Sequence, residues 1–392
     1  MYQLVPDHNA VIRRPEFRTE WEFDAGAQIN GGLAIVEDTL IVDTLAGDLI
    51  ALDARDGSLL WHAHANNALM SSPVIKSGVV FVGTGTNQRM SGVAASSAYF
   101  PSSNDDPTWG RPEGDAEIAF DMTTGKMIWR RATRGEDMPS PAILNGTLVF
   151  ANGDLHAYGL DWSSGLIRWR KPTGGVSTMA SATVSAKTVL LSVCGKRFQA
   201  CATMDVNPVV GSQYWRANYG SSDSSPAVSN DLKEVFVSGV ESVSPFRVHV
   251  GRAVVAALSQ KTGSVIWEYD SENAGPYSEV GSSERAVAGT YNAGTLYQAI
   301  PTEDRLIAFD GRSGSIKWAV KTAGPVKMSP VVDFGHVYFG DSAGVFYNVD
   351  AANGALLTTR LFKQPFSTSP PIIVGSTIII ADSSKVLAFP IH

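Results

Sequence analysis

Two adjacent acidic residues, Glu136 and Asp137, occupy a connection between two apolar runs, in the segment RRATRGEDMPSP. A carboxylate in such a connection can take a proton from a hydroxyl group or orient a water molecule. Earlier in the chain, the segment VFVGTGTNQ places Asn87 two residues after a Gly-Thr-Gly sequence. The alternative for both features is structural: Asn87 caps a turn and the acidic pair is solvated.

The cysteines and two histidines are further candidates. Cys194 and Cys201 are separated by six residues, which is neither a metal-knuckle spacing nor a redox Cys-x-x-Cys motif. Two buried free thiols, a disulfide that pins a loop and a reactive thiol all remain open, and a disulfide would favour an exported protein. His62 and His64 lie two apart in WHAHANN, so on a strand both point to one side. A metal site there would need a third ligand, and none can be assigned.

Several charged residues also lie in connections between the apolar runs. Gathered around one opening, the basic ones would favour an anionic or polyoxygenated ligand, with arginine making bidentate contacts. Each one taken alone is more simply a solvated surface residue. The members of this group are Arg197, His249, Arg252, Glu284, Arg285 and Lys327.

These candidates are set in a repeated frame. A small residue is followed six positions later by glycine and four positions after that by tryptophan, as in Ala51, Gly57 and Trp61. Two strands in which apolar residues alternate with others flank a tight turn. In this turn an acidic side chain caps backbone amides and glycine takes the left-handed conformation. The indole is large enough to wedge between neighbouring sheets, and the small residue leaves room for it. The repeated aspartates are therefore predicted to be caps: Asp53, Asp121, Asp161, Asp310 and Asp350.

Another pair of short strands precedes each copy, so each unit is predicted to be a four-stranded meander. Repeats of about 40 to 50 residues with four strands each are typical of propeller blades. Trp21 lacks upstream strands of its own, while the C-terminal segment supplies three, so the two ends are predicted to complete one blade. The sequence thus predicts an all-β, eight-bladed β-propeller that forms a single domain over residues 1–392. Its other blades end near Trp61, Trp129, Trp169, Trp215, Trp267, Trp318 and Thr358.

Departures from the repeat spacing indicate where a ligand would bind. With strands A to D labelled from the axis outward, the B–C loops and the D-to-A connections return to one face. The surplus residues fall in these segments: before Trp129, around the two cysteines, and in the loops that carry His249 and Arg285. Loops tolerate change that strands do not. The axial opening on this face is therefore the expected site for a small polar or anionic ligand.

The A-x-D-x-x-T-G-x-x-x-W frame resembles the tryptophan-docking repeat of the quinoprotein (PQQ-dependent) alcohol dehydrogenases. That superfamily also contains an outer-membrane assembly lipoprotein and the tetrathionate hydrolases. The resemblance covers nearly the whole chain and implies the fold, but members with and without PQQ share the repeat. In the dehydrogenases an asparagine after Gly-Thr-Gly binds the calcium ion that accompanies PQQ, and an aspartate one blade later acts as base. The resemblance implies these roles for Asn87 and for Asp137 or Glu136.

The chain departs from the dehydrogenase pattern in four ways. Asn87 is displaced by one residue, and the tryptophan that follows the Gly-Thr-Gly-Asn segment in that family is not in place. The disulfide between adjacent cysteines known in that family is missing, and no glutamate can be assigned to complete the metal site. Calcium prefers six to eight oxygen ligands, and only Asn87, Glu136 and Asp137 can be proposed. PQQ with calcium is therefore one alternative, and a cofactor-free hydrolase similar to the tetrathionate hydrolases is another. The third is a non-catalytic propeller that binds or assembles a protein partner.

Composition excludes other classes. Charged residues make up 18% of the chain and the net charge of −7 is spread without a basic run, so nucleic acid is not an expected partner. No apolar run approaches the roughly 20 residues needed to cross a bilayer. The start, MYQLVPDHNAVIRR, lacks the layout of a signal peptide. We expect either a mature periplasmic or extracellular protein whose signal has been removed, or a cytoplasmic one.

Overall fold

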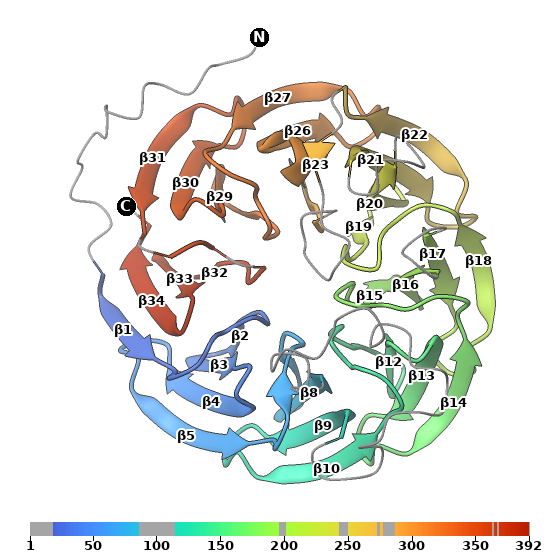
Figure 1. Ribbon diagram of the computed structural model, residues 1–392, viewed down its shortest axis with the longest axis vertical. Coiled ribbons are helices and arrows are strands. Elements are labelled where there is room, and N and C mark those ends of the chain that lie inside the picture. Colours follow the sequence, from blue (N-terminus) through green and yellow to red (C-terminus); the bar gives the residue numbers. More distant parts are fainter. Residues whose placement is uncertain are drawn as a thin grey trace. The chain divides into compact units, whose positions relative to one another are not determined.

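The computed structural model describes residues 19–85, 114–195, 201–242, 250–272, 275–276, 287–362, 364–366 and 368–391. They form an eight-bladed β-propeller of four-stranded antiparallel sheets, two of which carry an additional short strand (Figure 1). The predicted fold class is thus confirmed. Within the described ranges, no helix is long and apolar enough to cross a membrane.

Contacts divide the chain into two compact units, and the prediction of a single domain stays a prediction. One unit consists of residues 27–226 and 261–263 and contains four blades. Their strands are β2 (Ala34–Val36), β3 (Thr39–Asp43), β4 (Asp48–Asp53), β5 (Leu59–His64), β6 (Ala68–Leu69), β7 (Val74–Lys76), β8 (Val79–Gly85), β9 (Ala116–Asp121), β10 (Met127–Ala132), β11 (Ala142–Leu144), β12 (Thr147–Ala151), β13 (His156–Asp161), β14 (Ile167–Pro172), β15 (Thr183–Ser185), β16 (Thr188–Cys194), β17 (Cys201–Val206) and β18 (Gln213–Ala217).

The other unit consists of residues 1–26, 227–260 and 264–392, and it also contains four blades. Its strands are β1 (Trp21–Asp24), β19 (Ala227–Ser229), β20 (Glu234–Ser242), β21 (Val250–Ser259), β22 (Val265–Asp270), β23 (Gly275–Pro276), β24 (Thr290–Asn292), β25 (Thr295–Ile300), β26 (Arg305–Asp310), β27 (Ile316–Lys321), β28 (Val331–Asp333), β29 (His336–Gly340), β30 (Val345–Asp350), β31 (Leu356–Leu361), β32 (Ile372–Val374), β33 (Thr377–Asp382) and β34 (Lys385–Pro390), with a short 3-10 helix, η4 (Pro301–Glu303). Strand β1 pairs with β34, so the two ends complete one blade as predicted.

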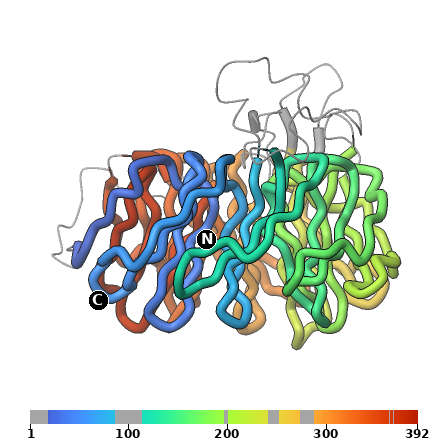
Figure 2. The backbone as a smooth tube through the Cα atoms, turned by 90° about the horizontal axis from the view of Figure 1, so that it is seen from below, coloured from blue at the N-terminus to red at the C-terminus, as the bar shows by residue number. Residues whose placement is uncertain are grey.

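Within a blade, successive strands run in opposite directions, so successive turns lie on opposite sides of the blade (Figure 2). One connection differs from the prediction. At both ends of the segment expected as a long loop in the blade of β19 to β22, the described residues are paired, because β20 and β21 extend into it. Arg252, predicted to lie in that loop, is in strand β21 opposite Glu241.

Within each unit, docking tryptophans contact the next blade, as their spacing predicts. Trp61 faces Ala51 on the neighbouring strand, and its indole N–H donates a hydrogen bond to the carbonyl of Met122 in the next blade at 2.7 Å. A Cβ atom added to Gly125, in the same turn as Met122, would lie 2.5 Å from the Trp61 ring. Gly125 also has a positive φ of 67°. Glycine is therefore needed in this turn both for its left-handed backbone and for the close approach of the indole.

The turn aspartates are caps, as their repetition predicts. Asp121 accepts hydrogen bonds from the backbone amides of Thr123 and Thr124, at 3.1 and 2.8 Å. The hydroxyl of Thr124 also donates to Asp121, at 2.8 Å, and makes the largest contribution to lowering the pKa of Asp121 below its ordinary value, with the amides adding to it. The corresponding carboxylates Asp53, Asp161, Asp310 and Asp350 accept amide hydrogen bonds in the same way.

Candidate functional site

Asp137 lies in the connection between β10 and β11 and is fully buried. Its backbone amide donates to the carbonyl oxygen of Thr84, at the end of β8, at 2.9 Å. This close approach requires Gly83, because a Cβ atom there would lie 1.9 Å from the carbonyl oxygen of Asp137. The first glycine of the Gly-Thr-Gly sequence therefore allows the backbone of Asp137 to pack directly on β8. The alternative prediction that the acidic pair is solvated is wrong for Asp137.

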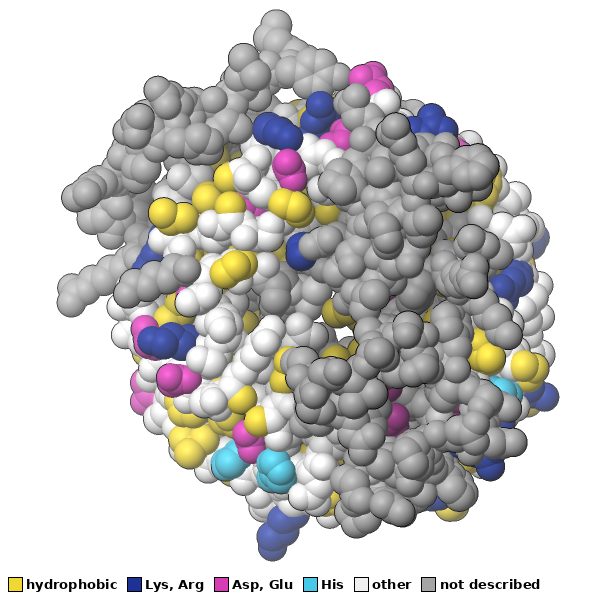
Figure 3. Space-filling view, viewed as in Figure 1, with side chains coloured by type: hydrophobic (Ala, Val, Ile, Leu, Met, Phe, Trp, Pro, Cys, Tyr) yellow, Lys and Arg dark blue, Asp and Glu magenta, His cyan; other side chains and the backbone are white. Residues whose placement is uncertain are grey.

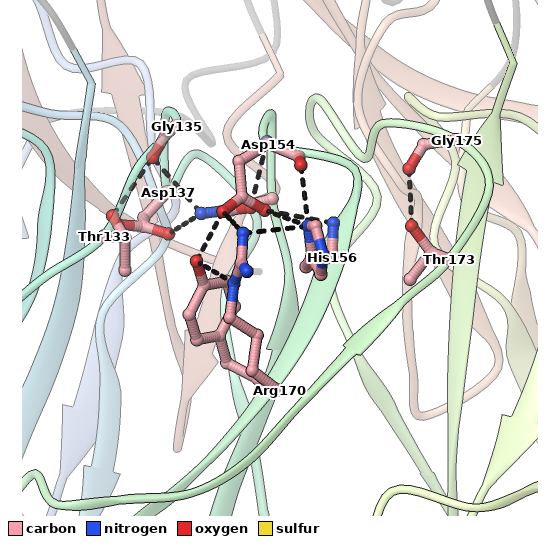
Figure 4. A network of polar contacts seen from close by, with 10 residues as sticks. Thr133, Gly135, Asp137, Asp154, His156, Arg170, Thr173 and Gly175 are labelled. Atoms are coloured by element: carbon pink, nitrogen blue, oxygen red, sulfur yellow. Dashed lines mark hydrogen bonds and ion pairs between the residues drawn. The ribbon is translucent and has the colours of Figure 1, made fainter. Parts of the chain in front are cut away.

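The carboxylate of Asp137 is held by two neutral donors. The hydroxyl of Thr133 donates to Oδ2, and the side-chain amide of Asn152 donates to Oδ1 at 2.9 Å (Figure 4). The same amide also donates to the carbonyl of Gly135 at 3.2 Å. Burial raises the pKa of Asp137 well above its ordinary value, while the two donors act in the opposite direction. The two donors fix the orientation of this carboxyl group.

Asn152 connects Asp137 to a second carboxylate, Asp154. The side-chain oxygen of Asn152 accepts from the backbone amide of Asp154 at 3.1 Å. Asp154 is buried, forms an ion pair with Arg170 at 2.8 Å, and accepts a hydrogen bond from the hydroxyl of Tyr158 (Figure 4). A buried carboxylate with a cationic partner and a hydroxyl donor is well compensated. The network therefore has a paired carboxylate, Asp154, and a carboxyl group without a cationic partner in that network, Asp137.

Glu117 in strand β9 is a second fully buried carboxyl group beside Asp137. In the register of β8 and β9 it stands opposite Gly83, the glycine on which Asp137 packs. Neither carboxyl oxygen of Glu117 has a hydrogen-bond partner among the described residues. Burial raises the pKa of Glu117 well above its ordinary value, and the adjacent Asp137 raises it further. Glu117 and Asp137 are called the carboxyl pair below.

The positions of the carboxyl pair recur in other blades. The first lies two residues before the residue that faces the docking tryptophan or its replacement, Thr358. The second is the position of Asp137. The residue at this position donates its backbone amide to the carbonyl of a residue at or just after the end of the second strand of a blade. In three other blades the two positions hold Leu49 with Leu69, Ala157 with Ser177, and Phe346 with Phe366. The rings of Phe346 and Phe366 are 5.7 Å apart, and Leu49 and Leu69 belong to one buried cluster. Among these equivalent positions, only the carboxyl pair is ionisable.

The remaining predicted site residues are distributed as follows. Glu136 is half-buried, and its carbonyl accepts from the amide of Gly153 at 3.2 Å. Lys327 is also half-buried and lies between β27 and β28, in the other unit from Asp137. On the face shown in Figure 3, the described basic side chains are scattered among acidic, hydrophobic and neutral ones. The following candidates lie outside the described residues: Asn87, Arg197, His249, Glu284 and Arg285.

The two cysteines form a disulfide. Cys194 ends β16 and Cys201 begins β17, and the two residues face each other in the strand register. The amide of Ser222 lies 3.0 Å from the sulfur of Cys194. The disulfide closes the loop between these strands. A disulfide that pins a loop is one of the three alternatives that the spacing left open.

His62 and His64 lie on one side of β5, as their spacing predicts. Both rings contact the same oxygen of Asp48, at 2.8 and 3.0 Å. All three side chains are at least partly exposed. Throughout the described part of the chain, no three His, Cys, Asp or Glu side chains are arranged to hold a metal ion. The histidines therefore form a surface hydrogen-bonded group with Asp48.

The described residues do not fit the calcium ion that accompanies PQQ in the dehydrogenases. Each oxygen of Asp137 already accepts a hydrogen bond from a neutral donor. The described residues supply no cluster of three ligating side chains, whereas calcium takes six to eight oxygens. Asn87, the other proposed ligand, lies outside the described residues.

Sequence reasoning identified Asp137 but missed Glu117 and Asn152. A signal for Glu117 was present: it stands two residues before Ala119 in the repeat frame, where the copy around Trp61 has Leu49. Asp43 carries a similar signal. It stands two residues after Ile41, the residue that faces Ala51 of the repeat frame. In other blades the residue at the same place in the strand register is small, as in Gly83 and Ala151. Asp43 is fully buried and, within the described ranges, neither of its oxygens has a partner.

Comparison with known proteins gives relatives of three kinds. The tetrathionate hydrolase of Acidithiobacillus ferrooxidans is 24% identical over 369 residues, which cover 92% of this chain and 72% of the relative. The structure of BamB from Moraxella catarrhalis matches with a TM-score of 0.68 at 16% identity, covering 95% of this chain and 99% of that one. The quinohemoprotein alcohol dehydrogenase of Comamonas testosteroni matches with a TM-score of 0.67 at 13% identity, covering 96% and 76%.

The structural matches show a shared fold, because their sequence identities are low. The family comparison is more specific. A family model described as outer membrane protein assembly factor BamB matches residues 14–100, 96–253 and 251–391, which together span nearly the whole chain. The chain therefore belongs to this family of PQQ-like β-propellers.

Proposed function

We propose that the protein is a hydrolase in which the carboxyl pair, Glu117 and Asp137, supplies acid–base catalysis on a small anionic substrate of the tetrathionate type. The observation that carries the proposal is that two buried carboxyl groups occupy positions where three other blades have residues that do not ionise. Buried ionisable groups cost stability unless they are paired. Positions that break a local rule in this way are typical of functional sites.

The pair has the groups that hydrolysis needs. One group must take a proton from the attacking water, and another must supply a proton where charge develops on the leaving group. Two carboxyl groups whose surroundings differ can divide these roles. Here the surroundings differ strongly, because Asp137 accepts two hydrogen bonds and Glu117 accepts none among the described residues. Both groups are shielded from bulk water, so substrate binding has to open a path to them.

The substrate class is supported by the relatives. The tetrathionate hydrolase of Acidithiobacillus ferrooxidans aligns over 92% of this chain, and it is named for a small sulfur oxyanion. Arg134 is exposed on the same connection as Asp137 and is a candidate for contacting such an anion. The disulfide between Cys194 and Cys201 supports an exported protein, periplasmic or extracellular. The axial ligand site predicted from the loop lengths stays a prediction.

The test is hydrolysis of tetrathionate by the purified full chain, followed by ion chromatography. We expect the wild-type protein to consume tetrathionate and Asp137→Asn to lose the activity. Asp161→Asn is the matched control, because Asp161 is a cap in an exposed turn of the repeat. Absence of any hydrolysis by the folded wild-type protein from pH 3 to pH 8 would refute the proposal for this substrate.

A second candidate function is protein binding or assembly. It is favoured by coverage: the chain covers 99% of the BamB structure but 72% of the tetrathionate hydrolase. Apolar residues such as Leu59, Leu60, Leu166 and Ile167 are exposed on or next to outer strands of the blades, where a partner could contact them. A scaffold of this kind would keep its binding in Asp137→Asn, whereas the proposed hydrolase would lose its activity. The same variant therefore distinguishes the two functions.

A further inference from the structure

We infer that the carboxyl pair holds one proton between its two members and that the proton resides on Glu117, which leaves Asp137 as the carboxylate. The inference rests on the proposed function, since it assigns the acid and the base of that site. It makes Glu117 the proton donor of the pair. Its spectroscopic test does not depend on hydrolysis.

Glu117 and Asp137 lie side by side. Glu117 faces Gly83 across the strands, and Asp137 packs on the same glycine, with a Cβ atom added to Gly83 lying 2.9 Å from the Cβ of Asp137. Two like charges in such a place repel strongly because the surroundings have a low dielectric constant. Two adjacent buried carboxyl groups therefore do not both ionise near neutral pH.

Glu117 keeps the proton because its surroundings do not stabilise a carboxylate. A carboxylate is favoured where N–H and O–H donors point at its oxygens. Asp137 has such donors on both oxygens, from Thr133 and Asn152. Glu117 has none on either oxygen within the described residues, and it is fully buried. The ionised form is thus stabilised at Asp137 and left uncompensated at Glu117.

Nearby charges do not reverse this assignment of the proton to Glu117. Arg131 on β10 is the strand neighbour of Glu117, but its guanidinium donates to the carbonyl of Gly165 at 2.6 Å. Asp115 and Asp154 are negative neighbours of Asp137, and Asp154 is paired with Arg170. The hydroxyl of Tyr158 donates to Asp154. Among these groups, the donors that reach the pair are Thr133 and Asn152, and both act on Asp137.

The chain provides a matched contrast in the other unit. Asp341 is also fully buried, but four backbone amides and the hydroxyl of Tyr347 donate to it, at 2.7 to 3.1 Å. A carboxylate with five donors is compensated in its ionised form. Asp341 is therefore the internal control, a buried carboxyl group whose two oxygens both accept hydrogen bonds.

The experiment is infrared difference spectroscopy of the full chain at pH 7, which separates the carbonyl band of a protonated carboxyl group from the bands of carboxylates. We expect Glu117→Gln to remove one protonated-carboxyl band. Asp137→Asn is expected to keep the band of Glu117, and Asp341→Asn to leave every protonated band unchanged. If Glu117→Gln does not fold, Glu117→Leu is the substitute, since Leu49 stands at the equivalent position.

Coupling within the pair is read from the pH titration of the same band. In Asp137→Asn the negative neighbour is gone, so Glu117 should lose its proton at a lower pH than in the wild type. The inference is overturned if Asp137→Asn removes the band while Glu117→Gln keeps it, or if neither variant changes it. An unchanged titration of Glu117 in Asp137→Asn would overturn the sharing of one proton. A spectrum that behaves as expected, together with absent hydrolysis, would reject the proposed function alone.

Discussion

The same two positions of successive blades hold apolar residues in one blade and ionisable residues in the next. The apolar pair is Leu49 with Leu69, and the ionisable pair is Glu117 with Asp137. The leucines belong to an apolar cluster that joins their blade to the next and are fully buried. The carboxyl pair is equally buried but contributes two groups whose ionisation is opposed by burial. A repeat fold makes such a difference visible, because the other blades show which residues the scaffold prefers at each position.

The turn aspartates are the opposite case, because they are acidic residues that follow the repeat. Asp53, Asp121, Asp161, Asp310 and Asp350 recur at one position of the frame, and each caps backbone amides. Their repetition marks them as scaffold. Glu117 and Asp137 do not recur in the blades that hold Leu49, Ala157 and Phe346, and no cationic partner of Glu117 is present among the described residues. An acidic residue of this propeller is thus a stronger functional candidate when it interrupts the repeat than when it follows it.

The largest effect on stability is expected from a residue of the scaffold. Trp267 is buried between blades, and its indole donates to the carbonyl of Gly311 at 2.7 Å. Trp267→Ala should reduce the free energy of unfolding by roughly 3 to 5 kcal/mol, because it leaves a cavity and an unpaired carbonyl. Denaturant unfolding measures the change. A loss below 1 kcal/mol would show that the docking tryptophans do not hold the blades together.

The reverse effect is expected when the carboxyl pair is returned to the residues of the neighbouring blade. The double variant Glu117→Leu, Asp137→Leu restores the apolar residues found at Leu49 and Leu69. It should raise the free energy of unfolding at pH 8 by about 1 to 3 kcal/mol, because two buried carboxyl groups are replaced by apolar side chains. The gain should be smaller at pH 4. A loss of stability at pH 8 would mean that the pair is a structural feature.

The pH dependence of stability should reveal Glu117 directly. Its pKa in the folded protein is raised above the ordinary value of about 4.3 for a glutamate. The folded state therefore binds a proton that the unfolded state releases, so the stabilisation is complete below that ordinary value and is lost as the pH rises toward the folded pKa. Glu117→Gln should flatten the fall of the melting temperature between pH 4 and pH 8. If the melting temperature falls equally steeply with pH in the variant and the wild type, the pKa of Glu117 is not raised in the folded protein.

The smallest effect is expected at a repeated cap. Asp161 accepts hydrogen bonds from two backbone amides in an exposed turn. Asp161→Ala should cost about 1 kcal/mol in the free energy of unfolding and leave hydrolysis unchanged. Its pKa is lowered in the folded protein, chiefly by the hydroxyl of Ser163, so this stabilisation is present above the ordinary aspartate value and is lost at lower pH. A loss of activity in Asp161→Ala would remove the distinction between caps and site.

The sequence predicted the fold well because the frame repeats. The spacing of tryptophan, glycine and aspartate encodes the turns, the docking of each indole and the pairing of Trp21 with the C-terminal strands. It located Asp137 through its place in a connection. Glu117 was missed because a single acidic residue in an apolar strand becomes informative only when the copies are aligned on their strand register. Hydrogen bonds such as that from Asn152 to Asp137 depend on residues brought together by folding and have no signature in sequence spacing.

In the proposed function, Asp137 and Glu117 form the reactive site of an otherwise regular scaffold. The most direct test of this function is the rate of tetrathionate hydrolysis by Asp137→Asn compared with that by Asp341→Asn, both measured on folded protein. Each substitution removes one buried carboxyl group and keeps its size. We expect Asp137→Asn to reduce the rate by at least about 100-fold, the usual size of a lost acid–base group, and Asp341→Asn to retain most of it. Equal rates for the two variants would contradict the account.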